Sequence, residues 1–263
     1  MVVKYLRSDL FRRYVVDWVI AVLLLVIFFF VLEGAQPFKR QFSLNDLTIS
    51  HPFATVERVT GVQCILIALG IPLFVILVAT LVRARKLRYT QQQLYHNLQL
   101  GVLGLIVSLA ISGVVTDILK NWIARPRPDF LDRCGPKVGT PTDILVDIDV
   151  CTAPYGTRIL VDGMRSTPSG HSSISFSGLL FLTLWVLGQF KIFHTKQPIY
   201  KIIIACLPLG LATYIALSRT QDYRHHFVDI ILGTTIGCTF ASLSYSRYFS
   251  EETEEQNGPV LPY

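Results

Sequence analysis

The sequence has 263 residues, 51% of them hydrophobic, and its mean hydropathy of +0.48 is higher than soluble domains of this size usually reach. The formal net charge is +6, but the lysines and arginines are dispersed among short segments between apolar runs. They form no basic face of the kind that binds nucleic acid. Composition and charge therefore argue against a soluble or nucleic-acid-binding protein and favour a membrane protein.

Six apolar segments follow one another along the chain, each about as long as the hydrocarbon core of a bilayer is thick. They cover residues 15–32, 62–82, 98–119, 172–190, 202–218 and 227–245. A lipid-exposed backbone must satisfy its own hydrogen bonds, so we predict an all-α integral membrane protein with a six-helix transmembrane bundle. Buried helices of a soluble protein are the alternative. The first segment is too long for a signal peptide, so we expect an uncleaved span there.

Two parts are expected, a six-helix membrane domain over 1–249 and an acidic, disordered C-terminal tail over 250–263. Six spans place both termini on one side, and that side carries twelve of the 24 lysines and arginines. Their number therefore does not choose an orientation. If several lysines and arginines of the opposite loops, 120–168 and 219–226, take part in the reaction, they do not count toward the topology. The termini are then expected in the cytosol.

Two further loop features concern that opposite side. Cys134 and Cys151 share its long loop, where a disulfide would fit a non-cytosolic compartment, with two free thiols as the alternative. The polar and aromatic loop 33–61 is expected to cap the bundle, and the sequence assigns it no chemistry.

Spans three and five end on this side and spans four and six begin on it. Residues 120–128, 168–171 and 218–229 can therefore meet at one membrane face. The active site is expected at these non-cytosolic helix ends.

The first of these segments brings cations to a helix end. Lys120 lies on the helix and Arg127 follows it, next to prolines at 126 and 128 that stop the helix. The alternative is a basic helix end that reaches lipid headgroups, supported by Asp117 three residues before Lys120.

The second segment is Pro168-Ser169-Gly170-His171, at the start of span four. Ser169 is a natural N-cap and Gly170 permits close backbone approach, so the free amides of the helix can hold an anion. His171 in the first turn can donate a proton to a leaving oxygen. A capping turn with an exposed histidine is the alternative.

The third segment runs from Ser218 to Asp229 and places His225 one helical turn before that aspartate. An Asp229 carboxylate that accepts from one imidazole nitrogen would leave the other nitrogen of His225 free as a nucleophile. Metal binding by His225, His226 and Asp229 is the alternative, disfavoured because adjacent helical residues point about 100° apart. We expect His226 to be a packing or interfacial residue, and we predict no metal site.

Together, Lys-x6-Arg-Pro at 120–128, Pro-Ser-Gly-His at 168–171 and Ser-Arg-x5-His-x3-Asp at 218–229 resemble the signature of the type 2 phosphatidic acid phosphatase superfamily. Order and spacing agree at every signature position, and the resemblance in architecture covers nearly the whole chain. A closer resemblance to fungal diacylglycerol pyrophosphate phosphatases comes from three stretches, at 45–52, 127–134 and 218–226.

The resemblance implies a magnesium-independent enzyme that converts diacylglycerol pyrophosphate to phosphatidate and phosphatidate to diacylglycerol through a phosphohistidine. It implies no cofactor, and its partners would be the lipid phosphate and the bilayer, without nucleic acid. It places the site on the luminal face of a vacuolar or other endomembrane. The sequence leaves the oligomeric state open.

Carried over residue by residue, the resemblance makes His225 the nucleophile, Asp229 its orienting partner and His171 the acid for the leaving group. The phosphoryl oxygens would be held by Lys120, Arg127, Ser169, Gly170 and Arg219, with Arg125 and Arg224 adding positive field. Two alternatives stay open. One is a phosphatase of the same superfamily for polyprenyl pyrophosphate, sphingoid phosphate or sugar phosphate, and the other is a non-catalytic lipid-binding or transport protein.

Overall fold

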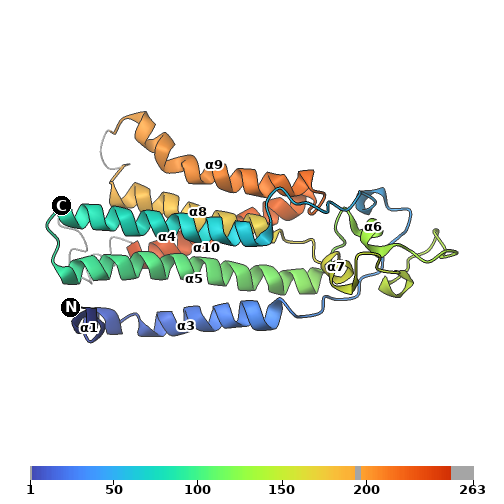
Figure 1. Cartoon of the computed structure of the whole chain (residues 1–263), viewed down its shortest axis with the longest axis horizontal. Helices are drawn as coiled ribbons and strands as arrows, with labels where there is room; N and C mark the ends of the chain where they lie inside the picture. The colour runs from blue at the N-terminus through green and yellow to red at the C-terminus, as the bar shows by residue number, and fades with distance from the viewer. Residues whose placement is uncertain (1, 193–196, 250–263) are drawn as a thin grey trace.

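The computed structural model describes residues 2–192 and 197–249. Six helices in this part are long and apolar enough to cross a membrane, as the six apolar segments predict. They lie side by side (Figure 1) and are α3 (Val15–Val26) continued by η1 (Ile27–Leu32), α4 (Gly61–Lys86), α5 (Gln91–Ile123), α8 (Gly170–Gln189), α9 (Ile199–Gln221) and α10 (Phe227–Phe249). The described residues form no β-strand, so the predicted all-α bundle is confirmed.

Helix α5 begins well before the apolar segment at 98–119, because polar residues extend it. Thr90 is its N-cap, and the Thr90 and Gln93 side chains each bond the other's backbone in a capping box. The same arrangement of Thr60 and Gln63 starts α4. These caps satisfy backbone amides that the apolar pattern does not reveal.

Helix α8 lies at the centre of the bundle and contacts α4, α5, α9 and α10. Small residues let α10 approach it closely. A Cβ on Gly233 would lie 2.4 Å from the Ser169 carbonyl oxygen, and one on Gly237 would lie 2.4 Å from that of Ser173. This close approach, typical of helix packing in membranes, places the start of α10 directly beside the start of α8.

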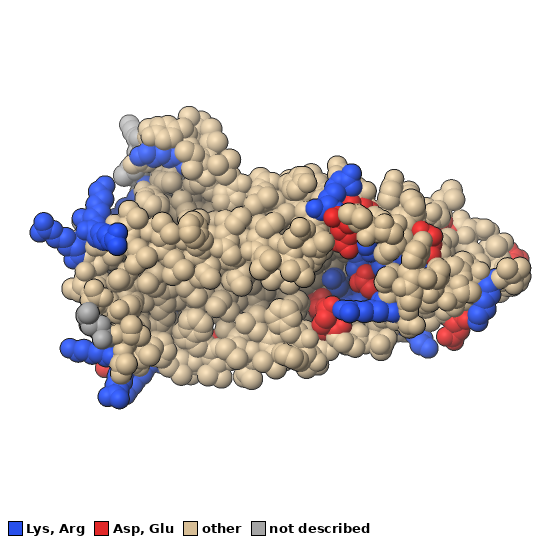
Figure 2. All heavy atoms as spheres, viewed as in Figure 1, with Lys and Arg blue, Asp and Glu red and all other residues tan. Residues whose placement is uncertain are grey.

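The outer surface of the bundle is apolar. Figure 2 shows a broad band nearly free of charged side chains between two charged ends. Large hydrophobic side chains of the spans are exposed, among them Phe30, Phe74, Ile203 and Leu207. Such a continuous apolar surface suits contact with lipid rather than water.

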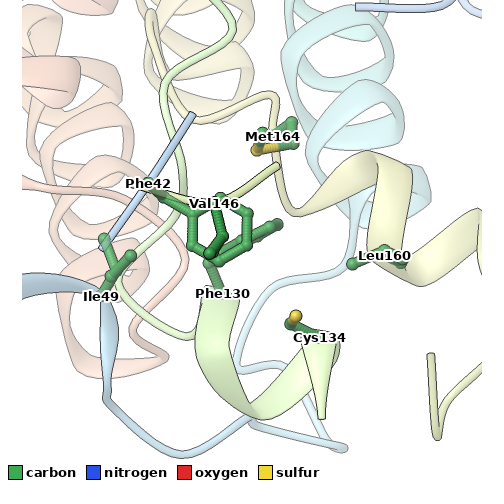
Figure 3. Packing of buried hydrophobic residues seen from close by; sticks show 7 residues of the cluster. All are labelled: Phe42, Ile49, Phe130, Cys134, Val146, Leu160 and Met164. Carbon is green, nitrogen blue, oxygen red and sulfur yellow. The ribbon is translucent and has the colours of Figure 1, made fainter. Parts of the chain in front are cut away.

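A cap made from residues 33–60 and 128–165 covers one end of the bundle, and it includes α6 (Phe130–Cys134) and α7 (Thr157–Asp162). Its own core unites side chains from both stretches, with the Phe42 and Phe130 rings 4.8 Å apart (Figure 3). The disulfide between Cys134 and Cys151, for which two free thiols were the alternative, is formed. Loop 33–61 therefore caps the bundle, as expected.

The start of α3 and the end of α10 lie at the end of the bundle opposite the cap (Figure 1). The acidic tail predicted over 250–263 lies outside the described residues, and so does His194. The division into a membrane domain and a disordered tail stays a prediction.

Candidate active site

The three signature segments meet at a cavity of about 600 Å³ beneath the cap. Figure 2 shows a hollow at this level, with basic side chains inside it and acidic ones at its rim. Of the eight residues predicted for the site, six line the cavity: Lys120, Arg127, Gly170, His171, Arg219 and His225. Ser169 and Asp229 are fully buried behind its wall.

His225 lies just before α10, and its Nδ1 is 2.7 Å from the backbone carbonyl oxygen of Ser166. A carbonyl can only accept, so Nδ1 carries the proton and Nε2 keeps its lone pair. Burial lowers the pKa of His225 well below its usual value, and the positive charges of Arg127 and Lys120 lower it further. The imidazole is therefore neutral at neutral pH and suited to act as a nucleophile.

Asp229 does not make the hydrogen bond to His225 that the sequence predicts. Its Oδ2 is 4.0 Å from Nδ1 of His225. It accepts instead from the Ser166 hydroxyl at 2.6 Å, the Thr167 hydroxyl and the backbone N–H of His226 at 2.9 Å. The physical reason is the helix start: a carboxylate in the first turn of α10 turns back to the unpaired amide there.

Asp229 thus orients His225 indirectly, through Ser166. It holds the hydroxyl of Ser166, and the carbonyl of the same residue holds the imidazole. Two residues left outside the predicted core of the site also contact this carboxylate. Arg125 is 3.2 Å from it, and Nδ1 of His226 is 3.3 Å from it. His226, predicted to be a packing residue, therefore belongs to the polar network around Asp229.

The start of α8 supplies the opposite wall. Ser169 caps the helix, with its Oγ 3.4 Å from the backbone nitrogen of Ser172 and its own N–H donating to the Asp229 backbone carbonyl at 2.9 Å. A Cβ on Gly170 would lie 2.9 Å from Nζ of Lys120, so glycine leaves room for the ammonium group. Nε2 of His171 is 3.0 Å from the Val59 carbonyl oxygen.

The three predicted phosphate-binding cations each have a carboxylate partner. Lys120 is 3.6 Å from Asp117, and Arg127 is 2.8 Å from Asp162. Burial lowers the pKa of Arg127 to about 10, against the opposing effect of Asp162, so it stays charged at neutral pH. Arg219 is 2.9 Å from Glu57. An incoming phosphate meets cations that are held in place but already neutralised in part.

Glu57 is a site residue that sequence reasoning missed. Its carboxylate lies between two arginines, 2.9 Å from Arg219 and 3.1 Å from Arg224. The Arg224 guanidinium also lies 4.5 Å from the centre of the Phe53 ring. Glu57 belongs to loop 33–61, where no motif or spacing marks it, so the sequence offered only an isolated acidic residue in a polar segment.

Asp162 is the second missed residue. It pairs with Arg127 at 2.8 Å and with Arg133 at 2.9 Å. Arg133 in turn makes a buried ion pair with Asp129 at 2.8 Å. Because these contacts join α6 and α7, the cap is tied directly to a cation of the cavity.

One wall of the cavity is apolar and lies where η1, α4 and α8 meet the cap. It is formed by Phe28 and Phe29 of η1, by Val62 and Ile65 of α4, and by Ile174 of α8. A molecule with a charged head and an apolar body could thus place each part against a matching surface. A second cavity, of about 780 Å³, shares six lining residues with the first and continues it toward the cap.

Within residues 2–192 and 197–249, no three His, Cys, Asp or Glu side chains gather as a set that could hold a metal ion. The reaction without metal or cofactor stays a prediction for experiment.

Comparisons with known proteins bear on the family. A model of the PAP2 superfamily matches residues 101–252. The chain is 46% identical over 215 residues to "Diacylglycerol pyrophosphate phosphatase 1" of Saccharomyces cerevisiae, covering 81% of this chain and 72% of that protein. It is 35% identical over 249 residues to "Lipid phosphate phosphatase 2" of Arabidopsis thaliana, covering 90% and 78%.

A third relative is "Probable diacylglycerol pyrophosphate phosphatase 1" of Schizosaccharomyces pombe, 41% identical over 225 residues that cover 86% of this chain and 77% of that protein. No solved structure matches the chain. The family model covers more than half of the sequence, and the relatives span most of it. The resemblance seen in the three signature segments is confirmed, and the chain belongs to the PAP2 superfamily.

Proposed function

We propose that this protein removes the terminal phosphate of membrane lipid phosphates, converting diacylglycerol pyrophosphate to phosphatidate and phosphatidate to diacylglycerol. One observation carries the proposal: the neutral imidazole of His225 shares a cavity with the three predicted phosphate-binding cations, Lys120, Arg127 and Arg219, and with an apolar wall. The names of the fungal and plant relatives support the same substrate class.

In the proposed first step, Nε2 of His225 attacks the terminal phosphorus, and the bond from phosphorus to the leaving oxygen breaks. His171, which takes up a proton on Nδ1 when the phosphate binds beside it, donates that proton to the leaving oxygen, while its Nε2 proton stays hydrogen-bonded to the Val59 carbonyl. In the second step, water gives a proton to His171 while its oxygen attacks the phosphorus and the phosphorus–nitrogen bond breaks. Inorganic phosphate leaves, and His225 is restored.

The remaining site residues have supporting roles in this mechanism. Lys120, Arg127 and Arg219 stabilise the charge on the phosphoryl oxygens, together with the backbone amide of Gly170 at the start of α8. Asp229 and Ser166 keep the proton on Nδ1 of His225. The acyl chains remain along the Phe28, Ile65 side of the cavity, so the lipid need not leave the bilayer.

The proposal places the termini in the cytosol and the site in the lumen of a vacuolar or other endomembrane. Five arginines near the cavity are buried and paired with carboxylates, namely Arg127, Arg133, Arg165, Arg219 and Arg224. We attribute these five arginines to the site and its supporting ion pairs. They are therefore left out when the loop charges that set the topology are compared. The disulfide in the cap also favours a non-cytosolic compartment.

The deciding experiment measures phosphate release from diacylglycerol pyrophosphate and phosphatidate in detergent micelles with excess chelator. The parent protein should be active, and His225→Ala should lose activity by about 10³-fold or more, since the nucleophile is gone. A parent that requires added metal, or a variant that keeps its rate, contradicts the mechanism. Sphingoid phosphate, polyprenyl pyrophosphate and sugar phosphate in the same assay define the substrate range.

A further inference from the structure

The cations that line the main cavity differ in how they are neutralised. There are five among the described residues: Lys120, Arg127, Arg158, Arg219 and Arg224. Four of them have a carboxylate oxygen within 3.6 Å, contributed by Asp117, Asp162 or Glu57. Arg158 is the exception, with no ion pair to any carboxylate in the described part of the chain.

The packing of α7 explains why Arg158 stays uncompensated. Asp162 lies four residues later on the same short helix, where an opposite charge would ordinarily pair with it. Arg127 and Arg133 hold the Asp162 carboxylate instead, at 2.8 and 2.9 Å. Glu57 is likewise engaged by Arg219 and Arg224. The positive charge of Arg158 is therefore left for a ligand.

Arg158 also occupies the junction of the two cavities. It lines both of them, together with Phe29 and Glu33 from the end of the first span and with Glu57, Asp162 and Arg224, which are already in ion pairs. No ion pair joins Glu33 to Arg158. Phe29 at this junction belongs to the aromatic wall of η1, whereas Lys120, Arg127, His171 and His225 line the first cavity alone.

We propose that Arg158 binds the second, non-transferred phosphate of a pyrophosphate headgroup. A lipid whose terminal phosphoryl group lies against His225 and whose acyl chains follow the Phe29 side of the apolar wall would bring its second phosphate to this junction. The guanidinium can hold two oxygens of that phosphate at once. Phosphatidate has no second phosphate and would gain nothing from the contact. The assignment depends on the proposed lipid phosphatase activity and adds a specificity residue to it.

The test compares steady-state kinetics on diacylglycerol pyrophosphate and phosphatidate in mixed micelles. Arg158→Gln should raise the KM for the pyrophosphate about tenfold, the loss expected for one partly exposed charge-assisted hydrogen bond, and leave phosphatidate within about twofold. Arg158→Lys should recover part of the loss. Lys39→Gln removes another exposed cation of the cap, outside both of these cavities, and should change neither KM.

A second measurement does not depend on hydrolysis of the pyrophosphate lipid. With phosphatidate as substrate, methylenediphosphonate and inorganic phosphate are compared as competitive inhibitors. Arg158→Gln should weaken inhibition by the diphosphonate about tenfold and leave inhibition by phosphate unchanged. Equal effects on both inhibitors, no effect on either, or the same selective loss in Lys39→Gln would overturn the assignment.

The lipid phosphatase function and the Arg158 assignment can be refuted separately. A parent protein that releases no phosphate from either lipid refutes the lipid phosphatase function and the Arg158 assignment with it. A parent that hydrolyses both lipids while Arg158→Gln keeps their ratio of kcat/KM refutes only the second-phosphate site.

Discussion

At the scale of single residues, a backbone carbonyl orients His225, and the carboxylate that the sequence pairs with it acts one contact further away. Ser166 joins the two, since its carbonyl accepts from the imidazole and its hydroxyl donates to Asp229. At 4.0 Å, Asp229 still lies close enough to stabilise positive charge on the ring in a buried site. The Asp229 carboxylate thus both holds the Ser166 hydroxyl and stabilises charge on the His225 ring.

The pH dependence of activity should reflect the electrostatic surroundings of His225. Burial and the neighbouring cations lower its pKa, so the imidazole stays neutral and reactive as pH falls through its usual value. Arg127→Gln removes one of these cations, raises the pKa and should move the acid limb of kcat/KM to higher pH. Titration of the substrate phosphate is common to both proteins, so the difference between the two profiles reports on the enzyme. Superimposable acid limbs would contradict this electrostatic coupling.

Glu57 should compete with phosphate for Arg219. Glu57→Gln removes the negative charge that Arg219 and Arg224 share, so inorganic phosphate should inhibit more strongly, by about five- to tenfold. Product inhibition of phosphatidate hydrolysis measures this. Glu33→Gln is the control, because it removes a carboxylate charge from the same cavity that is not paired with Arg219. Its inhibition constant for phosphate should stay within about twofold of the parent value. Matching inhibition constants for Glu57→Gln and the parent would disprove the competition.

At the scale of elements, the close packing of α10 on α8 sets the distance between the two catalytic histidines. Gly233 lies against the Ser169 carbonyl, directly beneath the capping turn that carries His171. His225 precedes the first turn of α10. A small change in the spacing of these helices would therefore separate the nucleophile from the proposed acid.

Gly233→Ala should destabilise the protein by about 1–3 kcal/mol and reduce activity, because its Cβ would lie 2.4 Å from a backbone oxygen. Gly210→Ala in α9 is the matched control, since no atom lies within 4 Å of its Cβ position. A glycine-to-alanine substitution inside a helix otherwise raises the free energy of unfolding by about 1 kcal/mol. Thermal unfolding in detergent, followed with residual phosphatase activity, compares the two. Equal midpoints would show that the contact is not tight.

At the scale of the whole molecule, the apolar band separates two ends of different charge character (Figure 2). At the cap end, five arginines are buried among carboxylates, although Lys39, Arg40, Lys137 and Arg158 are exposed there. At the opposite end, Arg7, Arg85, Lys86 and Arg88 are exposed. Since free cations near span ends favour the cytosolic side, the two ends are not equivalent although their numbers of lysine and arginine are equal.

This orientation predicts which end can be labelled in sealed vesicles whose outer face is cytosolic. A membrane-impermeant maleimide should modify Arg85→Cys in intact vesicles, and Asp143→Cys, at an exposed position of the cap, only after detergent is added. The parent protein controls for its own cysteines, of which Cys206 and Cys238 are partly accessible. The reverse pattern of labelling would invert the proposed topology.

The six spans, the end of the bundle at which the signature segments meet, and six residues of the cavity wall are all predictable from the amino-acid sequence. Apolar length and the order of the spans carry that information, because each depends on neighbours along the chain. Which partners hold these residues was decided only by the tertiary structure. Ser166 reaches His225 across 59 positions, and Glu57 reaches Arg219 across 162. Such contacts depend on the path of the cap, which no local pattern encodes.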